Sequence, residues 1–282
     1  MQPSSRLRSI TRIGLGVLAG ILIGNPILLY VMQERLIFHP VPMDDAKRKG
    51  IRDRLPSVNE ITLASDDGTK LHGWFQKAAR DDRAPLLIYF GGNEEDIAWL
   101  FAAQDRIPGR SLAAINYRGY GLSEGEPGER AIFADALRIF DALAKRDDVD
   151  PGDVAVMGRS LGSGVATYLA TARPVRAVVL VTPYDSIADI ASEKFWFAPV
   201  SMVLKHRFDS IGRARSIRVA ALFMVAADDD QIPVDRSRRL FEAWAGPKQW
   251  HLARGEDHST IGYYGPYWKV IGEFLARPQA PQ

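Results

Sequence analysis

The segment 154–170, VAVMGRSLGSGVATYLA, limits the possible folds more than any other part of the sequence. Its first four residues are a continuous apolar run typical of a buried strand, and an apolar pattern at helical spacing begins at Leu161. The strand must therefore turn directly into a helix through Gly158-Arg159-Ser160-Leu161-Gly162. This matches G-x-S-x-G, a turn in which a serine adopts strained backbone angles between small neighbours. The alternative is a glycine-rich turn with no catalytic role. Whether the chain supplies catalytic partners for Ser160 distinguishes the two interpretations.

Apolar strand patterns alternate with helical patterns along most of the chain. Alternation and an Asp66-Asp67-Gly68 turn predict an antiparallel hairpin over 59–65 and 70–76. Strands are expected within 85–92, 111–121, 154–157, 176–184, 219–230 and 248–255. Helices are expected near 94–105 and 129–145, between strands, and near 266–276, after the last strand. Buried strands separated by helices indicate an α/β fold with a mainly parallel central sheet, flanked by helices on both faces. We expect one such domain over 59–276, with a linker at 34–58 and a short tail at 277–282.

The N-terminal segment differs from the rest of the chain. A basic start without acidic residues precedes 20 residues without charge, at 13–32, which is long enough to cross a bilayer. We interpret residues 1–33 as a basic tail and an uncleaved single-pass transmembrane helix that places the domain outside the cytoplasm, on the periplasmic side if the host is bacterial. The alternatives are a cleaved signal peptide, an organelle transit peptide or a buried soluble helix.

Composition excludes several classes of function. The 282-residue chain has a net charge of +2, which does not indicate nucleic-acid binding, and it has no cysteine. Its sequence contains no phosphate-binding or dinucleotide-binding glycine motif and no His/Asp cluster at metal-ligand spacing. We therefore expect no metal and no cofactor.

Partners for a serine nucleophile follow later strands in the required order. A serine hydroxyl needs a base and a group that orients the base, and in sheets of this type the acid and then the histidine follow the serine along the chain. The run 228–230, three aspartates, follows the strand that ends at Ala226. Of the five histidines, only His258 lies in a loop after the last strand. This order favours Ser160 as nucleophile and His258 as base.

Several separated segments resemble one branch of a known superfamily. GRSLGSGVA, NYRGYGLSEGEP, TPYDSIADIA, DDDQIP and QERLIFHPVP, within 33–275, are similar to the Bem46-like branch of the α/β-hydrolases, which includes membrane-anchored serine hydrolases of the ABHD12, ABHD13 and ABHD17 type. The resemblance places the catalytic acid in D-x-x-[VI]-P, which makes Asp229 the acid here. Asp230 is the substitute if the loop register differs, and Asp185 is expected to cap the next helix instead.

The resemblance also implies an oxyanion hole. The backbone N–H of Leu161 should supply one donor, and Asn93, after the strand at 85–92, the other. The branch usually has His-Gly-Asn at that loop, whereas this chain has Gly91-Gly92-Asn93, which puts the rigidity of the loop in question. Tyr117 and Arg118 are expected to be structural.

An insertion at about 190–212 lies where many α/β-hydrolases carry a lid. Its apolar residues Phe195, Trp196 and Phe197 could wall an acyl chain, or they could simply cover the sheet. Together these features predict a serine hydrolase that cleaves carboxylic esters or thioesters of small-molecule or lipid substrates through an acyl-enzyme. The alternatives are a serine peptidase or amidase of the same fold and a non-catalytic binding protein. The sequence does not determine the oligomeric state.

Overall fold

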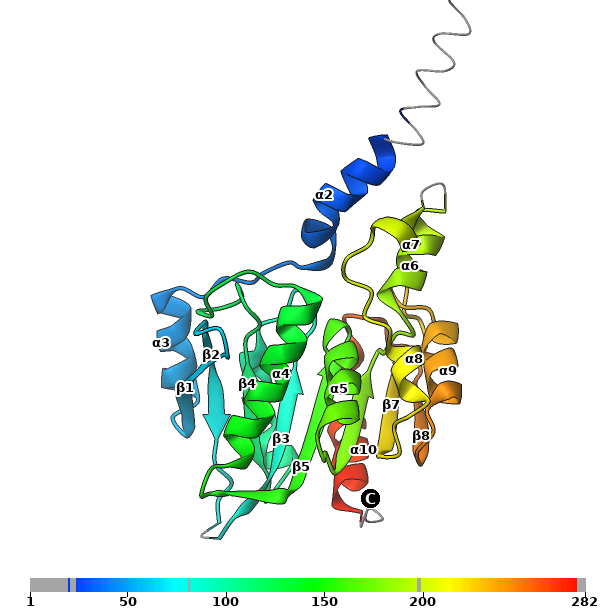
Figure 1. The fold of residues 1–282 in the computed structure, drawn as a ribbon. Helices are drawn as coiled ribbons and strands as arrows, with labels where there is room; N and C mark the ends of the chain where they lie inside the picture. Colours follow the sequence, from blue (N-terminus) through cyan, green and yellow to red (C-terminus); the bar gives the residue numbers. More distant parts are fainter. Residues whose placement is uncertain (1–19, 21–23, 81, 197–198, 278–282) are drawn as a thin grey trace, which may run out of the picture.

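A computed structural model describes residues 20, 24–80, 82–196 and 199–277 (Figure 1). Half of the predicted span at 13–32 lies outside these ranges, and its last part forms the start of a helix, α2, at Asn25–Ile37. Within the described ranges, no helix is both long and apolar enough to cross a bilayer.

The chain forms an eight-stranded sheet in the order β1-β2-β4-β3-β5-β6-β7-β8. From β4 to β8 every neighbouring pair is parallel, whereas the β1–β2 and β2–β4 pairs are antiparallel. The expected hairpin therefore forms the start of the sheet, and Gly68 in its turn has φ +85°, which glycine adopts at little cost. The strands are β1 Val58–Ala64, β2 Lys70–Gln76, β3 Ala84–Phe90, β4 Ser111–Ile115, β5 Val149–Arg159, β6 Ala177–Val181, β7 Ala220–Ala226 and β8 Lys248–Ala253.

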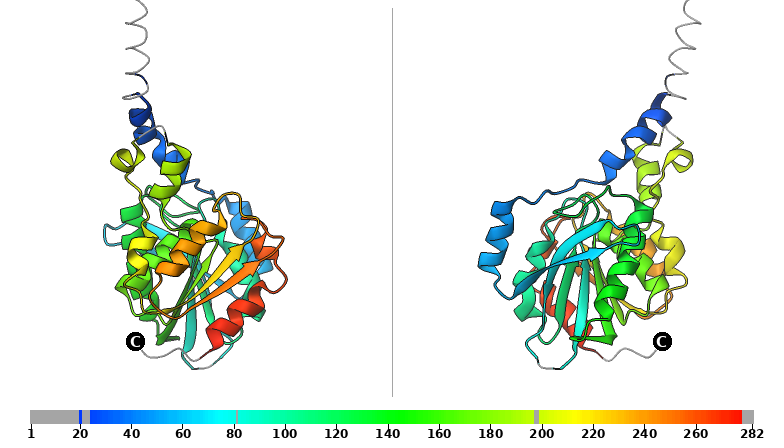
Figure 2. Two further views of the ribbon diagram at one scale, coloured as in Figure 1. Left: turned by 90° about the vertical axis from the view of Figure 1, so that its right-hand side faces the viewer. Right: turned by 60° about the vertical axis from the view of Figure 1, so that its left-hand side comes forward.

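Helices cover both faces of the sheet, as the alternating pattern predicts (Figures 1 and 2). On one face, side chains of α4, α5, α8 and α9 pack against the strands, and on the other face those of η2 and α10 do so. The bounds are α3 Asp45–Arg54, η2 Ile97–Arg106, α4 Glu129–Ala144, α5 Leu161–Ala172, α6 Ile187–Lys194, α7 Val200–Val203, α8 Ser210–Ala214, α9 Val234–Ala243, η3 Ile261–Tyr263 and α10 Tyr267–Ala276.

Three segments differ in detail from the sequence-based expectations. The helix expected near 94–105 is a 3-10 helix, η2, that begins after Asp96 caps its first turn. The segment expected as a linker contains α3, whose Asp44 side chain accepts a hydrogen bond from the Lys47 N–H and whose Ile51 is buried. The segment expected as a lid, residues 190–212, contains most of α6 and all of α7, and reaches into α8.

The parallel strands end at one edge of the sheet, and the loops that follow them meet there. The loops after β3, β5, β7 and β8 contain Asn93, Ser160, Asp229 and His258, respectively. Ligands of open α/β sheets bind at this edge because the loops after parallel strands converge on it.

Candidate active site

Ser160 lies in a strained turn between β5 and α5. Its φ of +50° and ψ of −119° are unfavourable for a residue with a side chain, at a cost of about 1–3 kcal/mol. The glycines on either side are required by close packing: a Cβ at residue 158 would lie 2.1 Å from the Gly162 carbonyl oxygen, and one at residue 162 would lie 2.0 Å from that of Phe90. The turn holds the serine side chain at the carboxyl end of β5.

Ser160, His258 and Asp229 form one hydrogen-bonded chain. The His258 Nε2 lies 3.0 Å from the Ser160 Oγ, and the Nδ1 lies 2.8 Å from the Asp229 Oδ2. The other Asp229 oxygen accepts hydrogen bonds from the N–H groups of Gln231 (3.0 Å) and Ile232 (2.7 Å). These bonds fix the carboxylate, so His258 donates from Nδ1 and its Nε2 can accept the serine proton.

The other candidate acids lie elsewhere. Asp228 and Asp230 are exposed on either side of the buried Asp229. Asp185, expected to cap α6, instead forms a buried ion pair with Arg236, 3.0 Å away. The capping prediction is wrong by one residue, because Ser186 caps α6 and accepts a hydrogen bond from the Asp189 N–H.

The two residues expected to form the oxyanion hole, Leu161 and Asn93, lie in two elements at this edge of the sheet, and Asn93 lines one cavity with Ser160. Leu161 is the first residue of α5, where an N–H has no acceptor within the helix. In the loop after β3, the Asn93 carbonyl accepts hydrogen bonds from the Tyr120 hydroxyl (2.8 Å) and the His39 N–H (3.2 Å). The Tyr117 hydroxyl donates to the Gly91 carbonyl at 2.8 Å. These bonds fix the loop even though glycine replaces the family's histidine.

The sequence did not lead us to Glu95, a buried carboxylate whose hydrogen bonds hold the residues around Ser160 in place. Its Oε2 accepts a hydrogen bond from the Gly92 N–H at 2.6 Å, and its Oε1 accepts from the Tyr89 hydroxyl at 2.5 Å and from the Trp99 indole. The Arg159 Nη1 lies 3.3 Å from the same Oε2. Glu95 thus connects the loop after β3 to the residue that precedes Ser160.

Arg159, also missed, extends this connection to the third loop. Its Nη2 donates to the His258 carbonyl at 2.8 Å. Burial disfavours the guanidinium charge, but the neighbouring Glu95 carboxylate outweighs it, so the pKa of Arg159 is raised. Two sequence features could have indicated these residues: an acid two residues after Gly-Gly-Asn, and an arginine at the second position of G-x-S-x-G. Both are common residues that a pattern search passes over.

A cavity of about 130 Å³ opens beside Ser160. Its lining is mostly polar and includes Asn93, Glu94, Gln231, His258 and Ser259. Among the residues that the structure describes, no group of three or more metal-ligating side chains is placed to hold an ion.

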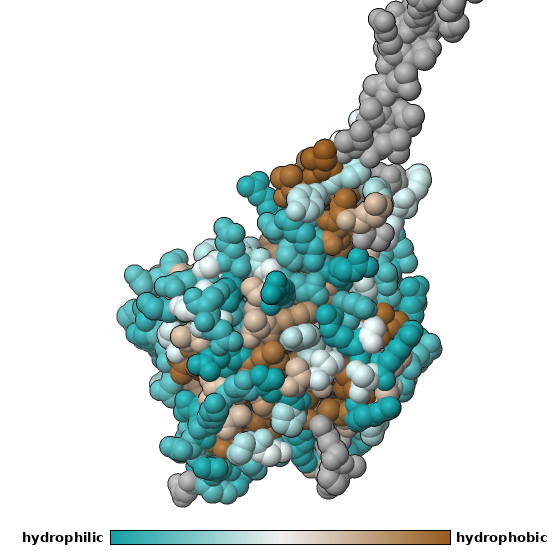
Figure 3. Space-filling model, in the orientation of Figure 1, coloured by the Kyte–Doolittle hydropathy of each residue, from teal (hydrophilic) through white to brown (hydrophobic). Residues whose placement is uncertain are grey.

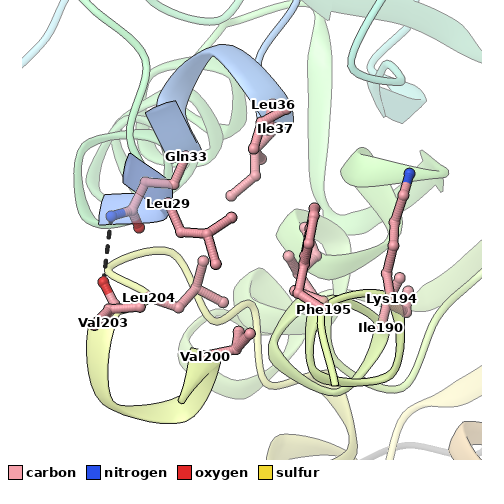
Figure 4. A pocket seen from close by; sticks show the side chains of 12 residues that line it. Leu29, Gln33, Leu36, Ile37, Ile190, Lys194, Phe195, Val200, Val203 and Leu204 are labelled. Carbon is pink, nitrogen blue, oxygen red and sulfur yellow. Dashed lines mark hydrogen bonds between the residues drawn. The ribbon is translucent and has the colours of Figure 1, made fainter. Parts of the chain in front are cut away.

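Phe195 and Trp196, two of the aromatic residues expected to bind substrate, do not line this cavity. Phe195 lines a separate apolar pocket of about 190 Å³ between α2 and the lid segment (Figure 4). Trp196 is 82% exposed, and Phe197 lies outside the described residues. The described part of the lid segment therefore adjoins α2, and none of its residues lines the cavity beside Ser160.

Comparison with known proteins gives consistent matches. Residues 71–216 match the family model described as "alpha/beta hydrolase fold". The chain is 31% identical over 289 residues to the alpha/beta hydrolase domain-containing protein WAV2 of Arabidopsis thaliana, covering 92% of each protein. It is 27% identical over 202 residues to lysophosphatidylserine lipase ABHD12 of Danio rerio, covering 62% of this chain and 51% of that protein. The structure of an acetyl xylan esterase from Paenibacillus sp. R4 superposes with a TM-score of 0.64 at 19% identity, covering 86% of this chain and 98% of that one.

Proposed function

Because the chain belongs to the α/β-hydrolase fold family, we propose that it is a serine hydrolase of carboxylic esters and thioesters, with Ser160 as nucleophile. The observation that carries the proposal is the 3.0 Å separation of the His258 Nε2 from the Ser160 Oγ. Ser160 lies in a strained turn, and Asp229 holds His258 from the other side of its ring. A serine kept for structure alone has no need of this strain or of a buried acid behind the histidine.

The reaction has two stages. In the first, the Ser160 Oγ attacks the acyl carbonyl carbon while His258 takes the hydroxyl proton at Nε2. The backbone N–H groups of Leu161 and Asn93 stabilise the charge that develops on the carbonyl oxygen. The bond to the leaving group then breaks, and His258 donates its proton to the departing oxygen or sulfur.

The second stage releases the acid. Water enters at the position of the leaving group, and His258 takes one of its protons as the water oxygen attacks the acyl-enzyme. The bond between the acyl carbon and the Ser160 Oγ breaks, the Oγ recovers the proton from His258, and a carboxylic acid departs. Asp229 keeps its charge throughout and stabilises the imidazolium form of His258.

The substrate class that we propose is a lipid-borne ester. The ABHD12 relative is named as a lipase, which supports a lipid ester over a peptide. The uncharged run at 13–32 supports a membrane tether, with the hydrolase domain on the far side of the membrane from a basic N-terminus. Extraction of membranes with alkaline carbonate tests the tether, since release of the full-length protein would contradict it. Protection of the domain from external protease on intact cells would reverse the orientation.

An active-site serine reagent tests the catalytic assignment. Wild-type protein should be labelled by a fluorophosphonate and should hydrolyse p-nitrophenyl esters. The Ser160→Ala variant should lose both properties and retain the wild-type melting temperature. Ser163→Ala is the matched control, because Ser163 lies in the next turn and its hydroxyl donates to the Ser160 carbonyl. Labelling that persists in Ser160→Ala would overturn the assignment.

A further inference from the structure

The pocket between α2 and the lid segment is apolar and preformed. The lining side chains come from α2 (Leu29, Leu36 and Ile37) and from the lid segment and its approach (among them Ile190, Phe195 and Val203). Figure 4 shows these side chains facing one another across the gap between the two elements. Segments separated by more than a hundred residues in the sequence therefore build one apolar volume.

Polar contacts fix the two walls without making the pocket polar. The buried Gln33 donates from Nε2 to the Val203 carbonyl (3.2 Å), and its Oε1 accepts from the Lys205 N–H (2.6 Å). The Lys205 ammonium lies 3.2 Å from Glu34 and 4.3 Å from the centre of the Tyr30 ring. The amide of Gln33 is thus already engaged, and a ligand in the pocket meets mainly hydrocarbon.

Ile37, at one end of the pocket lining, lies beside an active-site loop. Ile37 ends α2, and its carbonyl oxygen lies 3.4 Å from the Nδ2 of Asn93, the residue assigned to the oxyanion hole. Ile37, Ile187 and Ile190 pack against the core cluster that contains Leu161, which follows Ser160. The cavity beside Ser160 is mostly polar and suits a polar leaving group, whereas the pocket under α2 is lined mainly by hydrocarbon and suits an acyl chain.

The other end of the pocket lies among exposed apolar side chains. Ile27, Leu28 and Val31 on α2 are 59%, 56% and 67% exposed. Trp196, just after α6, is 82% exposed, and Met202, on α7, is 84% exposed. Figure 3 shows hydrophobic side chains gathered at this end of the molecule. Such a patch favours contact with an apolar phase over contact with water, and tryptophan suits a membrane interface.

We infer that this pocket holds the long acyl chain of a bilayer lipid ester and that α2 is one of its walls. The inference rests on the proposed function and specifies the acyl part of its substrate. A lipid chain is favoured over a protein segment because α2 continues the uncharged run at 13–32, which would bring the exposed rim to the bilayer surface. A chain can then enter at Leu29 and extend toward Ile37 without leaving an apolar environment.

Filling the pocket should change selectivity for acyl length. Val203→Phe and Ala191→Phe each add bulk at a lining residue, one from α7 and one from α6. Each should lower kcat/KM for a hexadecanoyl ester by about tenfold or more and leave that for an acetyl ester within about twofold. Glu193→Phe, two residues from Ala191 on α6 but exposed and outside the pocket lining, is the control and should behave as wild type. An equal loss for both esters, with wild-type melting temperatures, would contradict the inference.

A photoreactive probe locates the chain directly. A long-chain alkyl fluorophosphonate with a diazirine at its distal end should label Ser160, and irradiation should cross-link it to peptides from 25–37 or 187–204. Labelling of Ser160 with cross-links confined to other peptides would overturn the acyl pocket and leave the proposed function intact. Failure to label Ser160 at all would contradict the proposed function, and the inference with it.

Discussion

The cavity beside Ser160 and the pocket beneath α2 have similar volumes, about 130 and 190 Å³, but they are built in opposite ways. The first is polar, and its side chains are held by short hydrogen bonds between loops that follow neighbouring strands. The second is apolar, and one buried amide, that of Gln33, joins its two walls. Hydrogen bonds specify positions closely and apolar contacts specify mainly volume, so the first region is suited to chemistry and the second to selection of substrate.

The difference predicts how each region responds to substitution. Changes at the polar site should lower kcat for every ester, because they misplace reacting groups. Changes in the apolar pocket should affect only long acyl chains. The following predictions test that separation, in order of decreasing effect.

Asp229→Asn should give the largest loss among the supporting residues. An asparagine keeps its oxygen on the Gln231 and Ile232 N–H groups and turns its NH2 toward the His258 Nδ1. This favours the wrong tautomer of His258, so kcat should fall about ten-thousand-fold for short and long esters alike. Asp228→Asn and Asp230→Asn should leave kcat almost unchanged, because both side chains are exposed beside the buried Asp229. Side-by-side kinetics of the three variants measure this. Equal damage in Asp230→Asn would place the acid one residue later.

Glu95→Gln should have an intermediate effect. The amide cannot accept all the bonds from Gly92, Tyr89 and Arg159, so the loop after β3 and the His258 loop should both lose their fixed positions. We expect kcat to fall about ten- to a hundredfold, with KM nearly unchanged and the rate of fluorophosphonate labelling slowed in parallel. Asp105→Asn, at an exposed carboxylate on η2, is the control.

A purely structural Glu95 would give a different pattern. In that case Glu95→Gln would lower the melting temperature, while the folded fraction would keep its wild-type kcat and labelling rate. That result would remove Glu95 from the set of positioning residues.

Glu60→Gln, far from both regions along the sheet, should affect stability only. Burial opposes the charge of Glu60, but contacts with Arg48, Arg52 and His72 hold its pKa at about 2, below the ordinary 4.5. The stability that this charge contributes is therefore fully present above pH 4.5 and is lost as the pH falls toward 2. The variant should melt a few degrees lower than wild type at pH 7, and the gap should narrow in melts at pH 4 and pH 3. A gap that stays constant with pH would contradict the pKa assignment.

The side chains that hydrogen-bond around Ser160 could be named from the sequence, whereas the walls of the apolar pocket could not, for a physical reason. Ser160 belongs to a turn whose geometry depends on residues within two positions, and Asp229 and His258 follow strands that apolar runs make visible. Glu95 and Arg159 depend on how three loops fold together, which residue types alone do not reveal. Ser186 rather than Asp185 caps α6 because Asp185 is used by Arg236, a partner 51 residues away.

The apolar pocket depends on a contact between residues that are even farther apart in the sequence. The sequence indicated apolar residues at 195–197 as an acyl wall, but it could not show that α2 packs against the lid segment. That contact relies on Gln33, which lies 170 residues from Val203 and follows a run that reads as a membrane anchor. The 3-10 form of η2 and the helix α3 in the expected linker were likewise set by tertiary packing, since Ile51 and Leu100 are buried against the sheet.

Trapping the acyl-enzyme tests the central claim most directly. Wild-type protein should be mixed with a hexadecanoyl p-nitrophenyl ester, quenched in acid within the first turnovers and digested for mass spectrometry. We predict a hexadecanoyl adduct on the Ser160 hydroxyl that appears with the burst of p-nitrophenol and decays as water enters. Ester turnover with no adduct on Ser160, or with the adduct on another residue, would contradict the account.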